Sequence, residues 1–261
     1  RLNEMGVHKR RVIGHSMEFD HIKPYTKGDD VRMLNWKASA RTGNLMVNNY
    51  VEERSQQVYS VIDKGRTMKM PFNGLSLLDY AINASLVFSN VAVNKGDKAG
   101  LVTFTENKVE VLAASNKKVQ VNKILETLYA QDTQWQESDY EALSVQLRSS
   151  LSTRSLLMLY TNFESMSSLQ RQLPFLRRLA RYHLVLVVFF ENTELRKVTE
   201  QTAHDVESIY KQTIAQKFAY DKRLIVKELA KYGIMSLLSP PEQLTLNVVN
   251  KYLELKSRML I

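Results

Sequence analysis

The sequence predicts an α/β fold: a doubly wound, mostly parallel sheet with helices on both faces and an N-terminal extension. From Gln56 onward, short apolar strands alternate with helical segments, the order typical of strand–helix–strand units. Several of these strands are continuously apolar, as strands covered on both faces are. The 261 residues are 44% hydrophobic and include no cysteine, so we expect a large core without disulfides or thiolate metal sites.

The expected strands begin after residue 56 and are bounded by turn residues. In chain order they are Gln57–Asp63, Leu101–Thr105, Lys108–Ala113, Leu156–Tyr160, His183–Phe190 and Ile234–Leu238. The second and third are close enough in sequence to form a hairpin. The others are separated by helical segments, which favours parallel pairing.

Helical periodicity fills most of the gaps between these strands. Leu75–Asn94 is apolar almost all round, as a helix buried on a sheet would be, and Lys117–Tyr129 has apolar residues on one face. The other expected helices are one beginning near Ser138, then Leu169–Tyr182, Thr202–Tyr232 and Glu242–Met259. Pro174 should either kink its helix or begin a second one, and Gly233 should end the long helical stretch.

Residues 1–55 have a different pattern: an extended segment, a turn, a short helix, a turn and a strand. Gly28-Asp29-Asp30 forms the first turn, and Asp29 or Asp30 is placed to cap a helix over Val31–Thr42. Gly43 suits the end of that helix. We therefore divide the chain into an N-terminal segment, 1–55, that packs on a main domain, 56–261.

The net charge of +9 suggests three possible partners: nucleic acid, anionic lipid or an acidic protein. The basic residues are spread along the chain, with dense runs only at "HKRR" (8–11) and "LRRLAR" (176–181). A solvated basic surface is the simpler interpretation. No apolar run approaches the ~20 residues that span a bilayer. The chain starts at Arg1 without a signal peptide, so we expect a fragment whose targeting segment lies upstream.

Common catalytic signatures are missing from the sequence. It contains no phosphate-binding glycine loop, no His-Glu-x-x-His and no Gly-x-Ser-x-Gly motif. The five histidines show no metal-ligand spacing. Adjacent carboxylates at Glu52 and Glu53 would face opposite sides of a strand, so they cannot act on one atom. The sequence therefore predicts a protein that is not an enzyme and has no small-molecule substrate.

A possible cation site begins where the first main-domain strand ends. Asp63 opens the pattern Asp-x-Gly-x-Thr, with Gly65 and Thr67 at alternate positions. Asn162 follows another strand, and the carboxyl ends of parallel strands lie at one edge of a sheet, where ligands bind. The pattern leaves three interpretations open: a working Mg²⁺ site, a lapsed one, or only the end of a strand.

The stretch "GDDVRMLNWKASARTGNLMVNNYVEERSQQVYSVIDKGRTM", 28–68, resembles the signature of the bacterial family called Domain of Unknown Function 58. That family pairs Gly-Asp-Asp-x-Arg-x-x-x-Trp-x-x-x-Ala-Arg and a downstream Glu-Glu-Arg with a von Willebrand factor A-like domain. The resemblance implies this Rossmann-like fold and no enzymatic activity. It also implies two transmembrane helices upstream, a place at the cytoplasmic face of the inner membrane, and a MoxR-type AAA+ ATPase as partner.

The same resemblance suggests how a metal-ion-dependent adhesion site would be assembled. Such sites take Asp-x-Ser-x-Ser from a first loop, a Thr from a second and an Asp from a third. The matching positions here are Asp63, Gly65, Thr67, Ser138 with Asp139 beside it, and Asn162. Gly65 has no hydroxyl and Asn162 has no charge, whereas Mg²⁺ needs one or two carboxylates. We therefore expect a degenerate site without a cofactor, unless Asp139 turns inward as a substitute ligand.

The N-terminal motif supports a second hypothesis. Its marked residues are Gly28, Asp29, Asp30, Arg32, Trp36, Arg41 and Glu53. We expect Trp36 in a core. We expect the charged residues to form a polar network that fastens residues 1–55 to the main domain, because arginine pairs bidentately with carboxylates.

Together these observations favour a non-enzymatic protein–protein interaction module. It would be the soluble domain of a membrane-anchored protein that works with a MoxR-type ATPase. One alternative is a Mg²⁺-dependent ligand-binding A-domain. The other is electrostatic binding of anionic lipid or, less expected, of nucleic acid.

Overall fold

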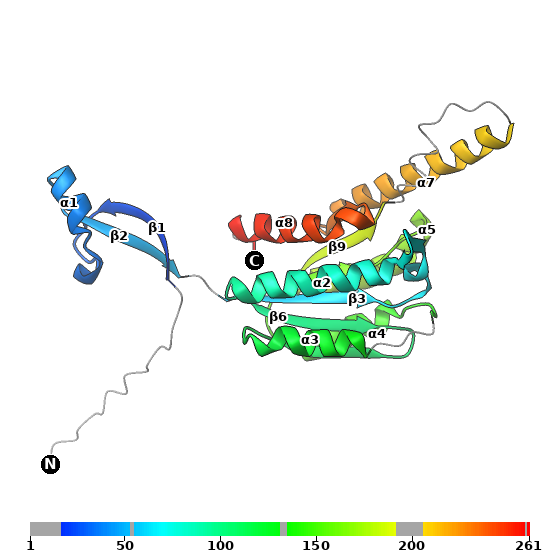
Figure 1. The fold of residues 1–261 in the computed structure, drawn as a ribbon, viewed down its shortest axis with the longest axis horizontal. Helices are drawn as coiled ribbons and strands as arrows, with labels where there is room; N and C mark the ends of the chain where they lie inside the picture. The colour runs from blue at the N-terminus through cyan, green and yellow to red at the C-terminus, as the bar shows by residue number, and fades with distance from the viewer. Residues whose placement is uncertain (1–16, 53–54, 131–134, 192–205, 259) are drawn as a thin grey trace, which may run out of the picture. The chain divides into compact units, whose positions relative to one another are not determined.

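A computed structural model describes residues 17–52, 55–130, 135–191, 206–258 and 260–261. The chain forms two compact units, Arg1–Ser55 and Gln56–Ile261, each of which is described by itself. The helices and strands are labelled in Figure 1.

The main unit is built on a six-stranded sheet with the order β10-β9-β8-β3-β6-β7. The strands are β3 (Gln57–Asp63), β6 (Lys98–Phe104), β7 (Val109–Ser115), β8 (Leu156–Tyr160), β9 (Leu184–Phe190) and β10 (Met235–Ser239). All neighbouring pairs are parallel except β6 and β7, which form the expected hairpin. The predicted doubly wound α/β fold is confirmed.

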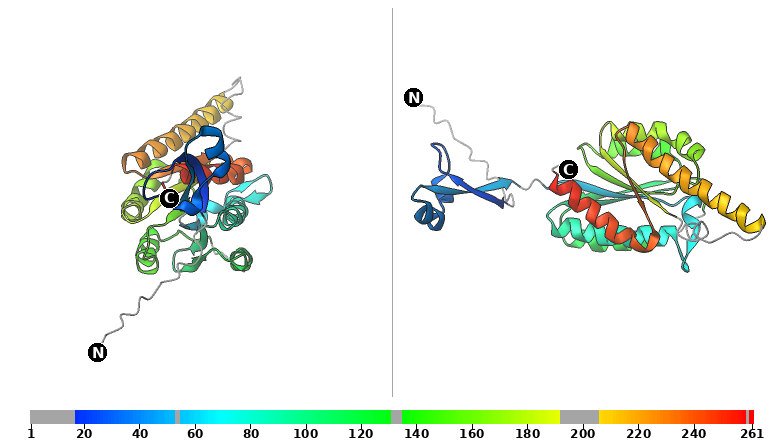
Figure 2. Two further views of the ribbon diagram at one scale, coloured as in Figure 1. Left: turned by 90° about the vertical axis from the view of Figure 1, so that its left-hand side faces the viewer. Right: turned by 90° about the horizontal axis from the view of Figure 1, so that it is seen from above.

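Helices cover both faces of this sheet (Figures 1 and 2). One face packs against α2 (Leu77–Asn94), α3 (Val119–Tyr129) and α8 (Leu244–Ser257). The other packs against α4 (Tyr140–Ser150), α5 (Met166–Ala180) and α7 (Val206–Lys231). Successive residues of β3 alternate between the two cores, with Val58 and Ile62 on one side and Tyr59 and Val61 on the other.

Local signals explain where the helices begin and continue. The first residues expected to be helical, Leu75 and Ser76, instead form β5, which pairs with β4 (Pro71–Phe72). Ser76 and Asp79 then form a capping box that starts α2. Pro174 lies inside α5, which continues through it. The expectation that a second helix begins at Pro174 is therefore wrong.

The N-terminal unit pairs β1 (Met17–Pro24) with β2 (Met46–Glu52) in an antiparallel ribbon. The single helix expected over Val31–Thr42 is wrong: the structure has a 3-10 turn, Val31–Met33, and then α1 (Trp36–Thr42). The break occurs where Leu34 bridges to β2 and the Asn35 side chain caps α1 by accepting from the Ala38 amide at 2.9 Å. Gly43 ends α1 with φ +69°, as expected.

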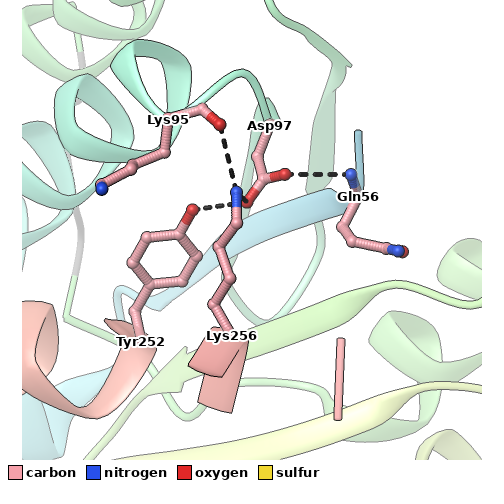
Figure 3. A network of polar contacts seen from close by, with 5 residues as sticks. All are labelled: Gln56, Lys95, Asp97, Tyr252 and Lys256. Carbon is pink, nitrogen blue, oxygen red and sulfur yellow. Dashed lines mark hydrogen bonds and ion pairs between the residues drawn. The ribbon is translucent and has the colours of Figure 1, made fainter. Parts of the chain in front are cut away.

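A buried carboxylate joins the start of the main unit to its last helix (Figure 3). Asp97 lies just before β6 and is fully buried. It accepts hydrogen bonds from the Gln56 amide at 3.0 Å, from the Tyr252 hydroxyl and from the Lys256 ammonium at 3.2 Å. Lys256 also donates to the Lys95 carbonyl at 3.1 Å. The residue just before β3 and the end of α8 therefore share one acceptor.

Candidate functional site

The candidate site lies at the carboxyl edge, defined here as the carboxyl ends of the parallel strands of the main sheet. The chain leaves β3 toward β6 on one side, whereas β8 lies on the other side of β3. Connections therefore diverge between β3 and β8, which is the topological switch point where open α/β sheets bind ligands. Asp63 ends β3, and Thr161 and Asn162 follow β8.

Asp63 is the centre of a closed polar cluster and is only 2% exposed. One carboxylate oxygen accepts from the Gly65 amide at 2.8 Å and from the Ser138 hydroxyl. The other accepts from the Tyr140 hydroxyl at 2.9 Å and from the Thr161 hydroxyl at 2.7 Å. We call these five residues the Asp63 cluster. Its four donors occupy the approximately four lone-pair sites of a carboxylate.

Tyr140 connects the cluster to the core beneath it. Its ring packs edge-on against Phe104, with centroids 5.1 Å apart, and its hydroxyl lies 2.6 Å from that of Thr161. Burial, followed by the charge of Asp63, raises the pKa of Tyr140 well above its usual value. The phenol therefore stays protonated at neutral pH and remains a donor.

Close packing explains why glycine stands at position 65. A β-carbon there would lie 2.4 Å from the Ser138 hydroxyl oxygen and 2.9 Å from an Asp63 carboxylate oxygen. Distances this short are excluded for carbon, so a serine at this position would displace the hydrogen bond between Ser138 and Asp63. The direct contact between Ser138 and Asp63 therefore leaves no room for a hydroxyl-bearing side chain at position 65.

The Asn162 side chain is held by two other parts of the main unit. Its amide nitrogen donates to the Thr67 carbonyl at 3.4 Å, and its oxygen accepts from the Lys222 ammonium of α7 at 2.6 Å. Lys222 also lies 5.3 Å from the Phe189 ring centroid. Burial lowers the pKa of Lys222 to about 8, while the charge of Glu164 acts in the opposite direction.

Asp139 does not replace the missing carboxylate. Its side chain accepts from the Ala142 amide at 2.9 Å and so caps α4. The expectation that Asp139 could turn inward is wrong, because the first turn of α4 needs an acceptor at this position. Of the positions matched to an adhesion site, Asp63 and Ser138 contact each other directly, whereas Thr67 contributes a backbone carbonyl to Asn162.

These residues do not fit a hard divalent cation. Mg²⁺ takes six oxygen ligands and relies on carboxylates for charge. The Asp63 oxygens are already taken by four donors, and the Asn162 oxygen faces an ammonium. Among the described residues, no group of three or more His, Cys, Asp or Glu side chains is placed to hold a metal. Absence of a cofactor stays a prediction, to be tested by titration.

A small pocket of about 120 Å³ opens beside the Asp63 cluster. Its rim carries Arg66 and Glu164, and Glu137 pairs with Arg171 at 3.3 Å. The described residues that line it include no histidine or cysteine, the usual bases and nucleophiles of acyl transfer. The pocket therefore presents mixed charges around a polar cluster whose hydroxyl groups are already bonded to one another or to Asp63.

Next to this pocket, α7 extends past the carboxyl edge in both Figure 1 and the right view of Figure 2. The first half of the helix, together with the next helical turn, exposes large side chains. They are Ile209 (54% exposed), Tyr210 (67%), Phe218 (42%) and Tyr220 (61%). Phe218 and Lys222 are four residues apart, so they lie on the same side of the helix. We call Ile209, Tyr210, Phe218 and Tyr220, which lie on more than one side of this projecting helix, the α7 surface.

Of the N-terminal motif residues, Gly28 and Asp30 take the expected turn and capping positions, whereas Trp36 does not take its expected place. Trp36 is 70% exposed, so its predicted place in a core is wrong: it is the first residue of a short helix in a unit with few other layers. Asp29 bonds to the Lys23 ammonium at 2.7 Å and to Thr26. The Lys23 hydrogen bond, with those from Thr26, lowers the pKa of Asp29 to about 2.

Asp29 and Asp30 make these contacts within the N-terminal unit, and the expected network to the main unit stays a prediction. Asp30 accepts from the Arg32 backbone amide at 2.9 Å and caps the 3-10 turn, whereas Gly28 has φ +122° in the preceding turn. Arg41 is exposed on α1, and Glu53 lies outside the described residues. Turn formation and capping account for the conformation of Gly28 and for the contacts of Asp29 and Asp30.

Sequence reasoning missed Tyr140, Thr161 as a partner of Asp63, and Lys222. Thr161 adjoins Asn162 at a strand end, so its place at the carboxyl edge was available from the pattern. Tyr140 sits in the first turn of a helix and Lys222 in the middle of one, and no local signal distinguishes them from other helical residues.

A model of the family described as "Protein of unknown function DUF58" matches residues 21–224. Comparison with curated proteins gave no significant match. Among solved structures, the SpRpn10 VWA domain is 10% identical, with a TM-score of 0.46, covering 76% of this chain and 95% of that one.

Two structures from Bacteroides show a similar level of likeness. An aerotolerance-related membrane protein from Bacteroides fragilis is 13% identical, with a TM-score of 0.43, covering 76% of this chain and 100% of that one. BatB from Bacteroides thetaiotaomicron, a conserved hypothetical protein, is 14% identical, with a TM-score of 0.37, covering 69% of this chain and 99% of that one. Likenesses this distant say nothing of function.

Proposed function

The chain belongs to the DUF58 family, and on that premise we propose that its von Willebrand factor A-like main unit is a non-enzymatic protein–protein interaction module. The partner that the family resemblance implies is a MoxR-type AAA+ ATPase. We place the binding surface at the carboxyl edge, on the α7 surface and the pocket beside the Asp63 cluster.

The exposed aromatic residues of α7 are the observation that carries this proposal. Large apolar side chains gathered on one projecting helix are typical of protein interfaces, where tyrosine, phenylalanine and arginine are enriched. Tyr210 and Tyr220 supply large contact area with few rotatable bonds. The nearby pocket adds Arg66 and Arg171 as groups that can pair with acidic side chains of a partner.

The state of the polar cluster supports recognition over catalysis. Ser138, Tyr140 and Thr161 all direct their hydroxyl groups at Asp63, which holds them as donors. A nucleophile needs a base that is available to take its proton, whereas Asp63 already accepts from three hydroxyl groups and an amide, and the described residues that line the pocket include no histidine or cysteine. The cluster instead fixes the loops after β3 and β8 and the start of α4 in one arrangement.

The alternative is that a partner binds at the carboxyl edge through a bound Mg²⁺ ion. An adhesion-type site would leave an open coordination position for a partner's carboxylate. Calorimetric titration of Mg²⁺ into the chain, with Asp63→Ala as the comparison, separates the two mechanisms. A micromolar signal that disappears in the variant would favour the metal-dependent binder.

The direct test is binding of the chain to a purified MoxR-type ATPase, with and without nucleotide. Tyr210→Ala and Tyr220→Ala should each weaken binding about tenfold or more, because truncating an interfacial aromatic commonly costs 1–2 kcal/mol or more. Tyr129→Ala is the matched control, since Tyr129 is 82% exposed on α3, which covers the other face of the sheet. Absence of binding in every nucleotide state, or an equal loss in the control, would contradict the proposal.

We also propose that the chain works at the cytoplasmic face of a membrane, as the family resemblance implies. None of the helices in the described residues is long and apolar enough to span a bilayer. Fractionation of cells that express the full-length gene product, before and after alkaline extraction, tests this placement.

A further inference from the structure

The opposite end of the main sheet carries a dense group of arginines. The strands β3, β8 and β9 begin side by side, since Val58 pairs with Leu156 and Leu156 with Leu184. We call this end the amino edge. The connections that lead into β8 and β9 touch there, because the Leu184 amide donates to the Ser155 carbonyl at 2.9 Å. Residues far apart in the sequence are thereby gathered on one surface.

Five exposed arginines lie on these two connections and the helix ends that precede them: Arg148, Arg154, Arg177, Arg178 and Arg181. We call them the arginine patch. The stretches 148–155 and 177–183 contain no aspartate or glutamate, so nothing within them offsets this charge. The "LRRLAR" run, which looked like an ordinary solvated surface in the sequence, supplies three of the five.

Aromatic side chains hold part of the patch in place. The Arg148 guanidinium lies 5.3 Å from the Tyr182 ring centroid, and that of Arg177 lies 4.4 Å from the Tyr232 ring centroid. Arg178 lies 3.5 Å from the Ser144 hydroxyl. Both tyrosines are themselves partly exposed, Tyr182 by 48% and Tyr232 by 39%. The guanidinium groups of Arg148 and Arg177 are therefore oriented before any ligand arrives.

A stabilising effect on helix ends explains only some of the arginines in the patch. Cations near the carboxyl ends of helices interact favourably with the backbone dipole, and Arg148, Arg177 and Arg178 lie in the last turns of α4 and α5. Arg154 lies in the connection beyond α4, four residues past its last helical residue. Burial, followed by the charge of Arg154, lowers the pKa of the neighbouring His183, so this histidine adds no charge at neutral pH.

The geometry points to the anionic headgroup surface of a phospholipid bilayer as the ligand of the arginine patch. Guanidinium groups match phosphate oxygens bidentately, and tyrosines beside them suit the boundary between headgroups and acyl chains. Stacking of nucleic-acid bases is disfavoured, because arginines of the same chain already lie over Tyr182 and Tyr232. Gln56, where the chain enters the main unit, is bonded at this same edge.

This inference does not depend on the proposed ATPase partner, which would bind at the carboxyl edge. The test is sedimentation of the full 261-residue chain with vesicles of 30% phosphatidylglycerol and 70% phosphatidylcholine, against pure phosphatidylcholine. We expect binding to the anionic vesicles only, and a steep loss of binding when salt is raised from 50 to 300 mM, since surface charges are screened over about 8 Å near physiological salt.

The variant Arg154→Gln/Arg181→Gln removes two patch charges whose side chains make no ring contact among the described residues. Each arginine near an anionic surface contributes roughly fivefold, so the double variant should bind about 25-fold more weakly. The control, Arg66→Gln/Arg171→Gln, loses the same charge, from +9 to +7, at the carboxyl edge. Its vesicle binding should change less than threefold.

Two results would overturn the inference. One is an equal loss in the two double variants, because binding would then depend on net charge alone. The other is failure to sediment with anionic vesicles; binding of a 30-base-pair duplex DNA that the patch variant no longer binds would then assign the patch to nucleic acid. Circular dichroism melting of each variant, expected to match the wild type, confirms that a loss of binding reflects the removed charges.

Discussion

Replacing Asp63 with alanine removes the acceptor on which the Asp63 cluster depends. Tyr140 and Thr161 can still bond to each other across their 2.6 Å separation. The Gly65 amide, the Ser138 hydroxyl and one of the two remaining hydroxyl groups then lose their partner. An unsatisfied buried donor costs about 1–3 kcal/mol, so we expect a loss of about 3–5 kcal/mol, allowing for partial relief by entering water.

Thermal and urea unfolding of the full chain measure this loss. For a unit of about 200 residues, 1 kcal/mol corresponds to about 2–4 °C, so the melting temperature should fall on the order of 10 °C. Asp63→Asn keeps the shape and one acceptor oxygen, and should cost only about 1–2 kcal/mol. Asp139→Ala is the matched control beside the site: it removes an N-cap and should cost about 1 kcal/mol.

Magnesium provides the second part of this experiment. If the cluster is closed as the geometry indicates, 5 mM MgCl₂ should leave the melting temperature of the wild type unchanged. A site with a dissociation constant of about 100 μM would instead stabilise the fold by about 2 kcal/mol at that concentration. An Asp63→Ala variant as stable as the wild type, or a stabilisation by Mg²⁺ that Asp63→Ala abolishes, would refute the reasoning.

Three further predictions follow from other contacts. Gly65→Ala should destabilise the chain by about 1–3 kcal/mol in urea unfolding, because its β-carbon would overlap Ser138 and Asp63. Since burial lowers the pKa of Lys222 to about 8, the unfolded chain binds more protons above pH 8; stability should therefore rise by about 1–2 kcal/mol between pH 8 and 9.5, below the range where tyrosines of the unfolded chain ionise, and Lys222→Met should remove that rise. Asp97→Asn should cost about 2–4 kcal/mol because it leaves the Lys256 ammonium without its charged acceptor, measured by melting against the wild type.

Much of the candidate site followed from strand ends alone. Asp63 and Asn162 were expected at one edge because parallel strands bring their carboxyl ends together, and the structure places them there. Ser138 was expected from the family pattern, and it contacts Asp63 directly. The direction of the Asp139 side chain could not be predicted, because capping of α4 and ligation compete for the same carboxylate.

The charge of the amino edge shows a different limit. The sequence gives the number of arginines and their runs, but its +9 net charge looked evenly spread. Only pairing of β8 with β9 brings the connections that carry Arg154 and Arg181 to one edge, and only packing of α5 against α7 places Arg177 on the Tyr232 ring. Surface patches are properties of the fold, because they combine residues from several connections.

By itself, the sequence determined the alternation of strands and helices, the hairpin of β6 and β7, and the position of Asp63 at a strand end. These features rest on hydrophobic periodicity and turn residues, which act over a few neighbouring positions. The tertiary structure alone decided that Lys222 meets Asn162 and that Trp36 is exposed. Such outcomes depend on which elements pack together and how closely, and no local pattern encodes either.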